Sequence, residues 1–364
     1  MPQRTSPHKT APPVRRRNER RTRLDIFIEL QEHDRRQVPV RGRPYSAGAD
    51  SALVPVTIPV ANDLALGLAR PCGTPAEAAA RCRGAIDARL SASGALLFRS
   101  LPLANRADFD AFMGALGYAP HSYSGGIAVR ARDAGRALLS SQEDPRITMA
   151  PHNEMAYLPD YPRKVFFFCA AAADEGGEVP INDIRLSAAQ IPDEVLAEFE
   201  RRRIGYHRYL PRMSTPTQIG WQDTFGLDDP DAIDALMRAK GHTHRWHDDG
   251  GLGYSYVHDA FRPDPATGAP LWFNQVTELH CSYWRHHPHF PSDSDDARYP
   301  ATTTYGDGEP IDPALVTALR ATLWRTSRAV AMRSGDVLVL DNTYIQHGRF
   351  AFSGPRMHLV SLTA

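Results

Sequence analysis

Short apolar runs punctuated by turn-forming residues dominate the chain after residue 120 and constrain its fold most strongly. Residues 165–169 read VFFFC, and residues 336–341 read DVLVLD. Short, continuous runs rich in aromatic and β-branched residues predict buried strands. Residues 346–352 and 356–362 flank a Ser-Gly-Pro turn, which predicts a closing hairpin. Many short strands separated by turns favour a sandwich or a jelly roll.

Helices are predicted at three places that flank the strand-rich part. Thr74 and Asp312 each precede a proline, and this order is typical of an N-cap followed by proline at the first helical position. These signals predict helices from residue 74 to about 90 and from 312 to about 328, and a third is expected over 106–116. The predicted fold class is therefore mostly β with flanking helices.

Basic residues crowd the first 24 positions, where eight arginines and lysines accompany a single acid, Glu19. Such a segment has too little apolar surface to order itself, which predicts a disordered tail over 1–45. A partner-binding arm is the alternative. One domain is then expected over residues 46–364.

The composition of the whole chain excludes several classes of protein. It balances 42 basic against 42 acidic residues, which argues against a nucleic-acid binder. No apolar run reaches the ~20 residues that a membrane-spanning helix needs. Four scattered cysteines without a C-x-x-C pair predict free thiols and a reducing, cytoplasmic location.

The first candidate site is a histidine and a carboxylate two residues apart, His152 and Glu154. In an extended chain such residues lie on the same side, because strand side chains alternate. One more histidine would complete a set of two histidines and one carboxylate, which leaves coordination positions open and is typical of non-heme Fe(II) oxygenases. An isolated H-x-E pattern also occurs by chance in surface loops.

His347 and Arg356 lie close to the C-terminus and can supply the remaining parts of such a site. The predicted hairpin would bring them together. Arginine binds a carboxylate through two parallel hydrogen bonds. Metal ligands, open positions and a carboxylate anchor together indicate 2-oxoglutarate as a co-substrate rather than a hydrolytic reaction.

Two segments resemble the site segments of the taurine dioxygenase-like (TauD/TfdA) superfamily. They are HNEMAYLPDYPRKVFFFCAAAADEGGEVPINDIR at 152–185 and GDVLVLDN…HGRFAFSGPR at 335–356. Shorter motifs at 221–222, 272–275 and 305–308 resemble the syringomycin aspartyl hydroxylase-like subgroup, whose substrate amino acid is held on a carrier protein. The resemblance covers residues 85–364.

The resemblance implies a double-stranded β-helix, or jelly roll, in which His152, Glu154 and His347 bind Fe(II). Arg356 would hold the distal carboxylate of 2-oxoglutarate. With O2 as the other co-substrate, such enzymes remove a substrate hydrogen, and hydroxylation is the default outcome. Desaturation, epoxidation and cyclisation start from the same step and stay open.

The substrate implied by the resemblance is a small molecule, an amino acid or an amino-acid-derived intermediate of antibiotic or other natural-product biosynthesis. It would be free or carrier-tethered. A non-catalytic jelly-roll binding protein is the alternative of another class. The presence of all four site residues argues against that alternative, because a protein without catalysis does not need them.

Two further features concern the surroundings of the site. Val179 stands where the family often has a threonine that helps to bind 2-oxoglutarate, so that hydrogen bond is not expected here. The long separation between Glu154 and His347 predicts a large insertion between core strands, over 205–330, which we expect to form a substrate lid.

Four residues are candidates for contact with the substrate: Tyr157, Gln275, His280 and Asn342. The alternative for His280 is a core histidine, and the alternative for Asn342 is a turn residue. Two further histidine groups are predicted to face solvent because their segments are charged or contain proline; they are His242, His244 and His247, and His286, His287 and His289.

Overall fold

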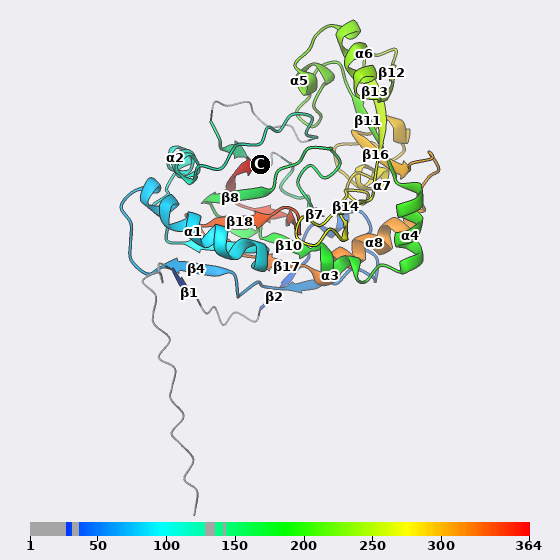
Figure 1. Cartoon of the computed structure of the whole chain (residues 1–364). Helices are drawn as coiled ribbons and strands as arrows, with labels where there is room; N and C mark the ends of the chain where they lie inside the picture. The colour runs from blue at the N-terminus through cyan, green and yellow to red at the C-terminus, as the bar shows by residue number, and fades with distance from the viewer. Residues whose placement is uncertain (1–26, 31–35, 128–134, 141–142) are drawn as a thin grey trace, which may run out of the picture.

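Two β-sheets face each other in the computed structural model, which describes residues 27–30, 36–127, 135–140 and 143–364 (Figure 1). The major sheet contains, in spatial order, β1 (Phe27–Glu29), β4 (Ala65–Leu68), β5 (Ala95–Arg99), β18 (Val337–Asp341), β8 (Lys164–Ala171), β21 (Met357–Thr363) and β6 (Leu138–Leu139). The minor sheet contains β17 (Arg328–Val330), β10 (Val179–Asp183), β19 (Ile345–Arg349) and β7 (Met149–His152). This double layer is the predicted jelly roll.

The central strand β8 shows why the apolar runs are continuous. Val165 and Phe167 pack with residues of the minor sheet such as Ile181. Phe166 and Phe168 pack on the other side, under the helices α1 (Pro75–Ser93) and α2 (Arg106–Leu116). A strand covered on both faces buries every side chain, so it loses the alternating pattern of a half-exposed strand.

The three predicted helices are confirmed. The side chain of Thr74 caps α1 by accepting a hydrogen bond from the amide of Glu77, and Gly94 ends the helix at a φ of 72°. Asn105 caps α2 in the same way. Asp312 caps α8 (Pro313–Thr326).

The predicted closing hairpin is wrong. β19 lies between β10 and β7 in the minor sheet, whereas β21 lies between β8 and β6 in the major sheet. The turn at Gly354, with a φ of 81°, therefore leads from one layer to the other. Each strand gains two partners in its own sheet, which stabilises it more than a two-stranded hairpin would.

Part of the predicted tail belongs to the fold. Residues 1–26 and 31–35 lie outside the described residues. β1 pairs with β4, and β2 (Gln37–Pro39) pairs with β3 (Thr57–Pro59). Next comes the short helix η1 (Arg43–Tyr45). The predicted domain boundary at residue 46 therefore lies too late.

The segment between α3 (Ile184–Ala188) and β17 forms a second body of structure, and part of it projects from the core (Figure 1). Its sheet has the strand order β12 (Thr243–Trp246), β13 (Leu252–His258), β11 (Ile204–Leu210) and β16 (Ala301–Tyr305). Its other elements are α4 (Asp193–Arg202), α5 (Trp221–Phe225), α6 (Pro230–Ala239), β14 (Phe261–Pro263), β15 (Pro270–Trp272), α7 (Cys281–Arg285), η2 (Asp296–Arg298) and α8, which packs under the minor sheet. The predicted insertion over 205–330 includes β17, which is instead a strand of the minor sheet.

Other expectations concern membranes and thiols. No described helix is long and apolar enough to cross a membrane. The four cysteines are free, and three of them, Cys82, Cys169 and Cys281, are buried. The prediction of free thiols is therefore confirmed.

Helix α8 supports β7, the strand that ends at the candidate residue His152. Trp324 is 1% exposed and stacks on Phe350 with ring centroids 5.8 Å apart. The two rings belong to one apolar cluster with Ala150 of β7 and with Val40 and Ile58 from the N-terminal part. The cluster therefore ties the beginning of the described chain to the minor sheet.

We expect Trp324→Ala to lower the free energy of unfolding by about 3–5 kcal/mol, because it leaves a cavity under the minor sheet. Urea denaturation would measure the change. Leu186→Ala is the control, since Leu186 is 58% exposed and its loss should cost less than about 0.5 kcal/mol. Equal costs for the two variants would contradict the role given to Trp324.

Candidate active site

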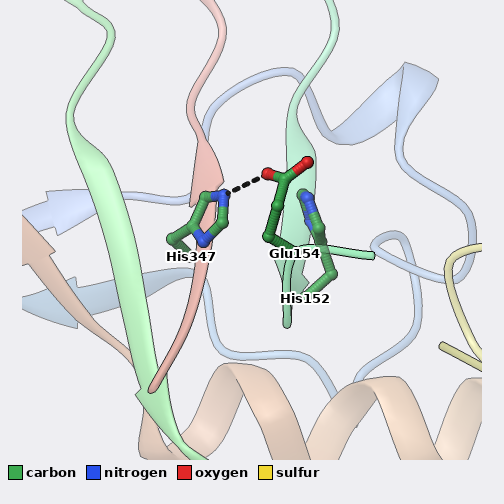
Figure 2. A group of neighbouring side chains, drawn as sticks. All are labelled: His152, Glu154 and His347. Atoms are coloured by element: carbon green, nitrogen blue, oxygen red, sulfur yellow. Dashed lines mark ion pairs between the residues drawn. The ribbon is translucent and has the colours of Figure 1, made fainter. Parts of the chain in front are cut away.

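His152 and His347 face each other across two neighbouring strands of the minor sheet. β7 and β19 are antiparallel, and these two histidines are direct partners in their register. Directly opposed residues point to the same face of a sheet. The ring centroids accordingly lie 4.8 Å apart. Figure 2 shows both rings beside the carboxylate of Glu154.

Glu154 enters the site from the turn that follows β7, not from the strand itself. Its Oε2 lies 3.3 Å from Nε2 of His347. Met155, the next residue, has a φ of 59°, so the chain turns sharply here. Among the described residues, His152, Glu154 and His347 form the one group of three metal-ligating side chains, with ligand atoms within 4.8 Å of one another.

The donor atoms of this group fit a divalent transition metal. Nδ1 of His152 lies 2.9 Å from the carbonyl oxygen of Ala150, a contact that puts the proton on Nδ1 and leaves Nε2 free to bind. Burial, together with the neighbouring His347, lowers the pKa of His152 and favours the neutral imidazole that a metal requires. Two imidazoles and one carboxylate on one side leave the other side of an iron ion open.

Asn342 holds the Glu154 turn in place. Its side chain accepts a hydrogen bond from the amide of Glu154 at 2.7 Å and donates to the carbonyl of Glu154 at 3.0 Å and to that of Pro162 at 2.8 Å. The side chain of Asn153 donates back to the carbonyl of Asn342 at 2.7 Å. Asn342 is completely buried and lines neither described cavity. This position favours the alternative in which Asn342 is a turn residue, and its hydrogen bonds show that it also holds the Glu154 turn.

A small cavity opens directly onto the three ligating side chains. Its lining includes His152, Glu154 and His347. Val179 and Arg356 also belong to the lining. His347 reaches this cavity from β19 of the minor sheet and Arg356 from the turn that leads into β21 of the major sheet, although the hairpin expected to join them does not exist. The valine side chain offers no hydroxyl at this wall.

Arg356 keeps a hydrogen-bond donor available in this cavity. Its Nε donates to the carbonyl of Gly177 at 3.1 Å, and its Nη2 donates to Nδ1 of His358 at 2.9 Å. Burial and the neighbouring Arg349 lower the pKa of Arg356 to about 10, so the guanidinium stays charged at neutral pH. The Nη1 and Nη2 atoms of Arg349 instead donate hydrogen bonds to the carbonyls of residues 143, 144 and 147.

A second cavity, of about 380 Å³, lies between the core and the insertion and also reaches His152. The insertion supplies Arg208, Gln275 and Glu278 to its wall. The guanidinium of Arg208 is buried, and it donates to the carbonyls of Pro300 at 3.2 Å and Gly125 at 3.3 Å. His152 therefore lines both cavities.

The remaining candidate substrate residues have different positions. Gln275 lines the larger cavity. Tyr157 is buried with its ring centre 5.9 Å from the guanidinium carbon of Arg208, but it is not part of the lining. His280 caps α7 by accepting a hydrogen bond from the amide of Ser282 and lines neither described cavity, which favours its alternative as a core histidine.

Sequence reasoning missed Arg208 and Glu278. Arg208 lies within the predicted insertion, and no local motif distinguishes it from the many other arginines. Glu278 follows Gln275 by three residues, a spacing that places both on one side of a helical turn. That spacing relates Glu278 to Gln275, but it does not show that either side chain lines a cavity.

One histidine of the group His286, His287 and His289 is not at the surface as predicted. His287 is 3% exposed, and its Nε2 lies 3.1 Å from a carboxylate oxygen of Glu143. His289 lies 3.0 Å from Asp144 in the same way. The segment containing them therefore packs against residues 143–144, and the prediction is wrong for His287.

We expect Asn342→Ala to lower the free energy of unfolding by about 3 kcal/mol, since it removes the partners of buried backbone groups. Affinity for a divalent metal should fall as well, because the Glu154 turn loses its support. Chemical denaturation and metal titration would measure the two effects. Gln222→Ala removes a partly exposed amide and should change neither quantity. A stable Asn342→Ala protein with unchanged metal affinity would contradict this account.

The sequence was compared with known families and proteins. Residues 70–363 match the taurine catabolism dioxygenase TauD, TfdA family. A clavaminate synthase-like protein of Arabidopsis thaliana is 29% identical over 284 residues, covering 76% of this chain and 83% of the relative. The dapdiamide synthesis protein DdaC of Enterobacter agglomerans is 29% identical over 280 residues, covering 76% and 84%.

Solved structures with a similar arrangement include two oxygenases. PvcB of Pseudomonas aeruginosa, from an isonitrile synthetic pathway, has 16% identity and a TM-score of 0.45, covering 92% of this chain and 93% of its own. An asparagine oxygenase has 14% identity and a TM-score of 0.43, covering 81% and 87%. The family match over residues 70–363 and the His-Glu-His group lead to one conclusion. The chain belongs to the TauD/TfdA family and is a non-heme Fe(II) dioxygenase that uses 2-oxoglutarate and O2.

Proposed function

We propose that His152, Glu154 and His347 bind the iron and that Arg356 binds the distal carboxylate of 2-oxoglutarate. One observation carries this assignment: the cavity that contains Arg356 is lined by the same three ligating side chains. A dicarboxylate in this cavity can reach the metal with one end and the guanidinium with the other. A charged arginine and a carboxylate form a strong, bidentate hydrogen-bonded pair.

Bound iron supplies, together with 2-oxoglutarate and O2, the power to oxidise an unactivated C–H bond. The protein positions the reactants. Phe167 of the major sheet packs edge-on against His347 with centroids 4.9 Å apart and keeps that side of the site apolar. The larger cavity holds the substrate next to His152, on the side of the ligating group that the insertion covers.

The proposed reaction is hydroxylation of an amino acid or an amino-acid-derived intermediate, free or carrier-tethered. The larger cavity combines the buried guanidinium of Arg208 with the carboxylate of Glu278, which suits a small zwitterionic molecule. The similarity to a dapdiamide synthesis protein supports a place in natural-product biosynthesis. Product analysis would distinguish hydroxylation from desaturation, epoxidation or cyclisation.

Two further parts of the proposal concern the setting of the reaction. The free cysteines favour the cytoplasm as its location. The insertion over the larger cavity acts as the substrate lid. The partner is a small molecule rather than a nucleic acid or a membrane, in line with the balanced charge of the chain.

We expect His347→Ala to abolish the visible absorption band that forms when Fe(II) and 2-oxoglutarate are added without oxygen. Decarboxylation of 2-oxoglutarate should be lost with it, because one of three ligands is missing. His286→Ala is the control, since His286 is exposed and lies outside both cavities. An intact band in His347→Ala would rule out His347 as a ligand.

We expect Arg356→Ala to raise the 2-oxoglutarate concentration required for activity by roughly ten- to a hundredfold, the value of one charge-assisted hydrogen bond. Binding of Fe(II) alone should survive, because no ligand is lost. Val179→Thr should lower the requirement if the new hydroxyl reaches the co-substrate. The control is Arg185→Ala at an exposed ion pair with Asp183. An unchanged requirement in Arg356→Ala would refute the assignment.

A further inference from the structure

Two buried oxygen atoms in the wall of the larger cavity have no hydrogen-bond partner among the described residues. They are Oε1 of Gln275 and Oε1 of Glu278. Both side chains line the cavity of about 380 Å³, and the two residues are only 4% and 9% exposed. An unpartnered buried acceptor costs free energy, and an unpartnered buried charge costs more. The cavity wall therefore contains two hydrogen-bond acceptors that lack a donor among the described residues.

We propose that Glu278 and Gln275 bind a positively charged amine of the substrate, so that the enzyme acts on a molecule with a free primary ammonium group. The proposal rests on the proposed function and narrows its substrate class. It adds a residue, Glu278, that no motif in the sequence identifies.

The backbone makes the two side chains neighbours in the cavity wall. The amide of Leu279 donates to the carbonyl of Gln275 at 3.2 Å, and this bond closes a helical turn that contains both Gln275 and Glu278. Side chains three residues apart on such a turn are neighbours. A primary ammonium has three N–H donors and can therefore bond to both oxygens at once.

The protein itself does not neutralise Glu278. Its other oxygen accepts a hydrogen bond from the hydroxyl of Thr277 at 2.8 Å, which is a neutral partner. The nearby cation Arg320 directs its donors to the hydroxyl of Ser282 and the carbonyl of Thr277 instead. Arg320 thus contributes a favourable field but no bond to the carboxylate.

The ionisation of Glu278 depends on opposing influences. Burial raises its pKa, while the Thr277 hydroxyl and the positive charge of Arg320 act in the opposite direction. An arriving ammonium removes the cost of the buried charge and satisfies the free oxygen in one step. A neutral alcohol or amide donor would satisfy the oxygen alone.

The location of the acceptor pair gives it a role in selection. Gln275 and Glu278 share their cavity with His152, so an amine bound there is held in the space that reaches the ligating group. Arg208 contributes a buried guanidinium to another part of the same lining. Glu278 and Gln275 are therefore binding residues that select and orient the substrate.

The test uses the full chain loaded with Fe(II) and 2-oxoglutarate in the absence of oxygen. The probes are the common L-amino acids, their pantetheine thioesters and the N-acetylated form of each compound. Binding is followed as a change in the visible absorption band. We expect compounds with a free amine to bind and their N-acetylated counterparts not to bind.

The variant Glu278→Gln preserves the shape of the side chain and removes its charge. We expect it to raise the dissociation constant of the amine-bearing compounds by about ten- to a hundredfold. The absorption band before addition of the compound should stay unchanged. Glu309→Gln is the matched control, because Glu309 is exposed and outside both cavities. Gln275→Leu is the second variant and should weaken the same compounds.

Three results would overturn the proposal: equal binding of the N-acetylated forms, an unchanged dissociation constant in both Glu278→Gln and Gln275→Leu, or no binding by any compound with a free amine. A wild-type protein that forms no absorption band with Fe(II) and 2-oxoglutarate would refute the proposed function itself. The two failures are therefore distinguishable.

Discussion

The antiparallel register between β7 and β19 is the constraint on which the rest of the site depends. It makes His152 and His347 direct partners, although 195 positions separate them in the chain. A slip of one residue would turn one of the two rings to the other face of the sheet. β19 is fixed on its other edge as well, where His347 is the partner of Ile181 in β10. The two imidazoles are thus as rigid as the minor sheet.

The carboxylate of the site is held by a different kind of interaction. Glu154 lies in a turn, where no ladder of backbone bonds fixes it, and Asn342 supplies the missing hydrogen bonds. Asn342 immediately follows β18 of the major sheet, so the turn is tied to the opposite layer. A buried polar network of this kind is rigid when every member is satisfied. The ligating group therefore combines sheet register with one asparagine.

The core and the insertion contribute different residues to the proposed active site. The core supplies the ligating group and Arg356, which we propose to bind iron and 2-oxoglutarate. The insertion supplies Arg208, Gln275 and Glu278 to the second cavity, where we propose that the substrate binds. Binding residues on segments outside the core can vary without disturbing the fold. In the proposed function, the insertion therefore selects the substrate.

The sequence by itself determined the buried strands, the three capped helices and the H-x-E and HGR segments, because these depend on local periodicity and on residue chemistry. It could not determine which strands pair. Residues 346–352 and 356–362 look like a hairpin, yet each is stabilised by partners far away in the chain. Nor could it identify Glu278, since a buried carboxylate looks like an exposed one until the fold closes a cavity around it. Burial and strand pairing are long-range properties, and only the tertiary structure decided them.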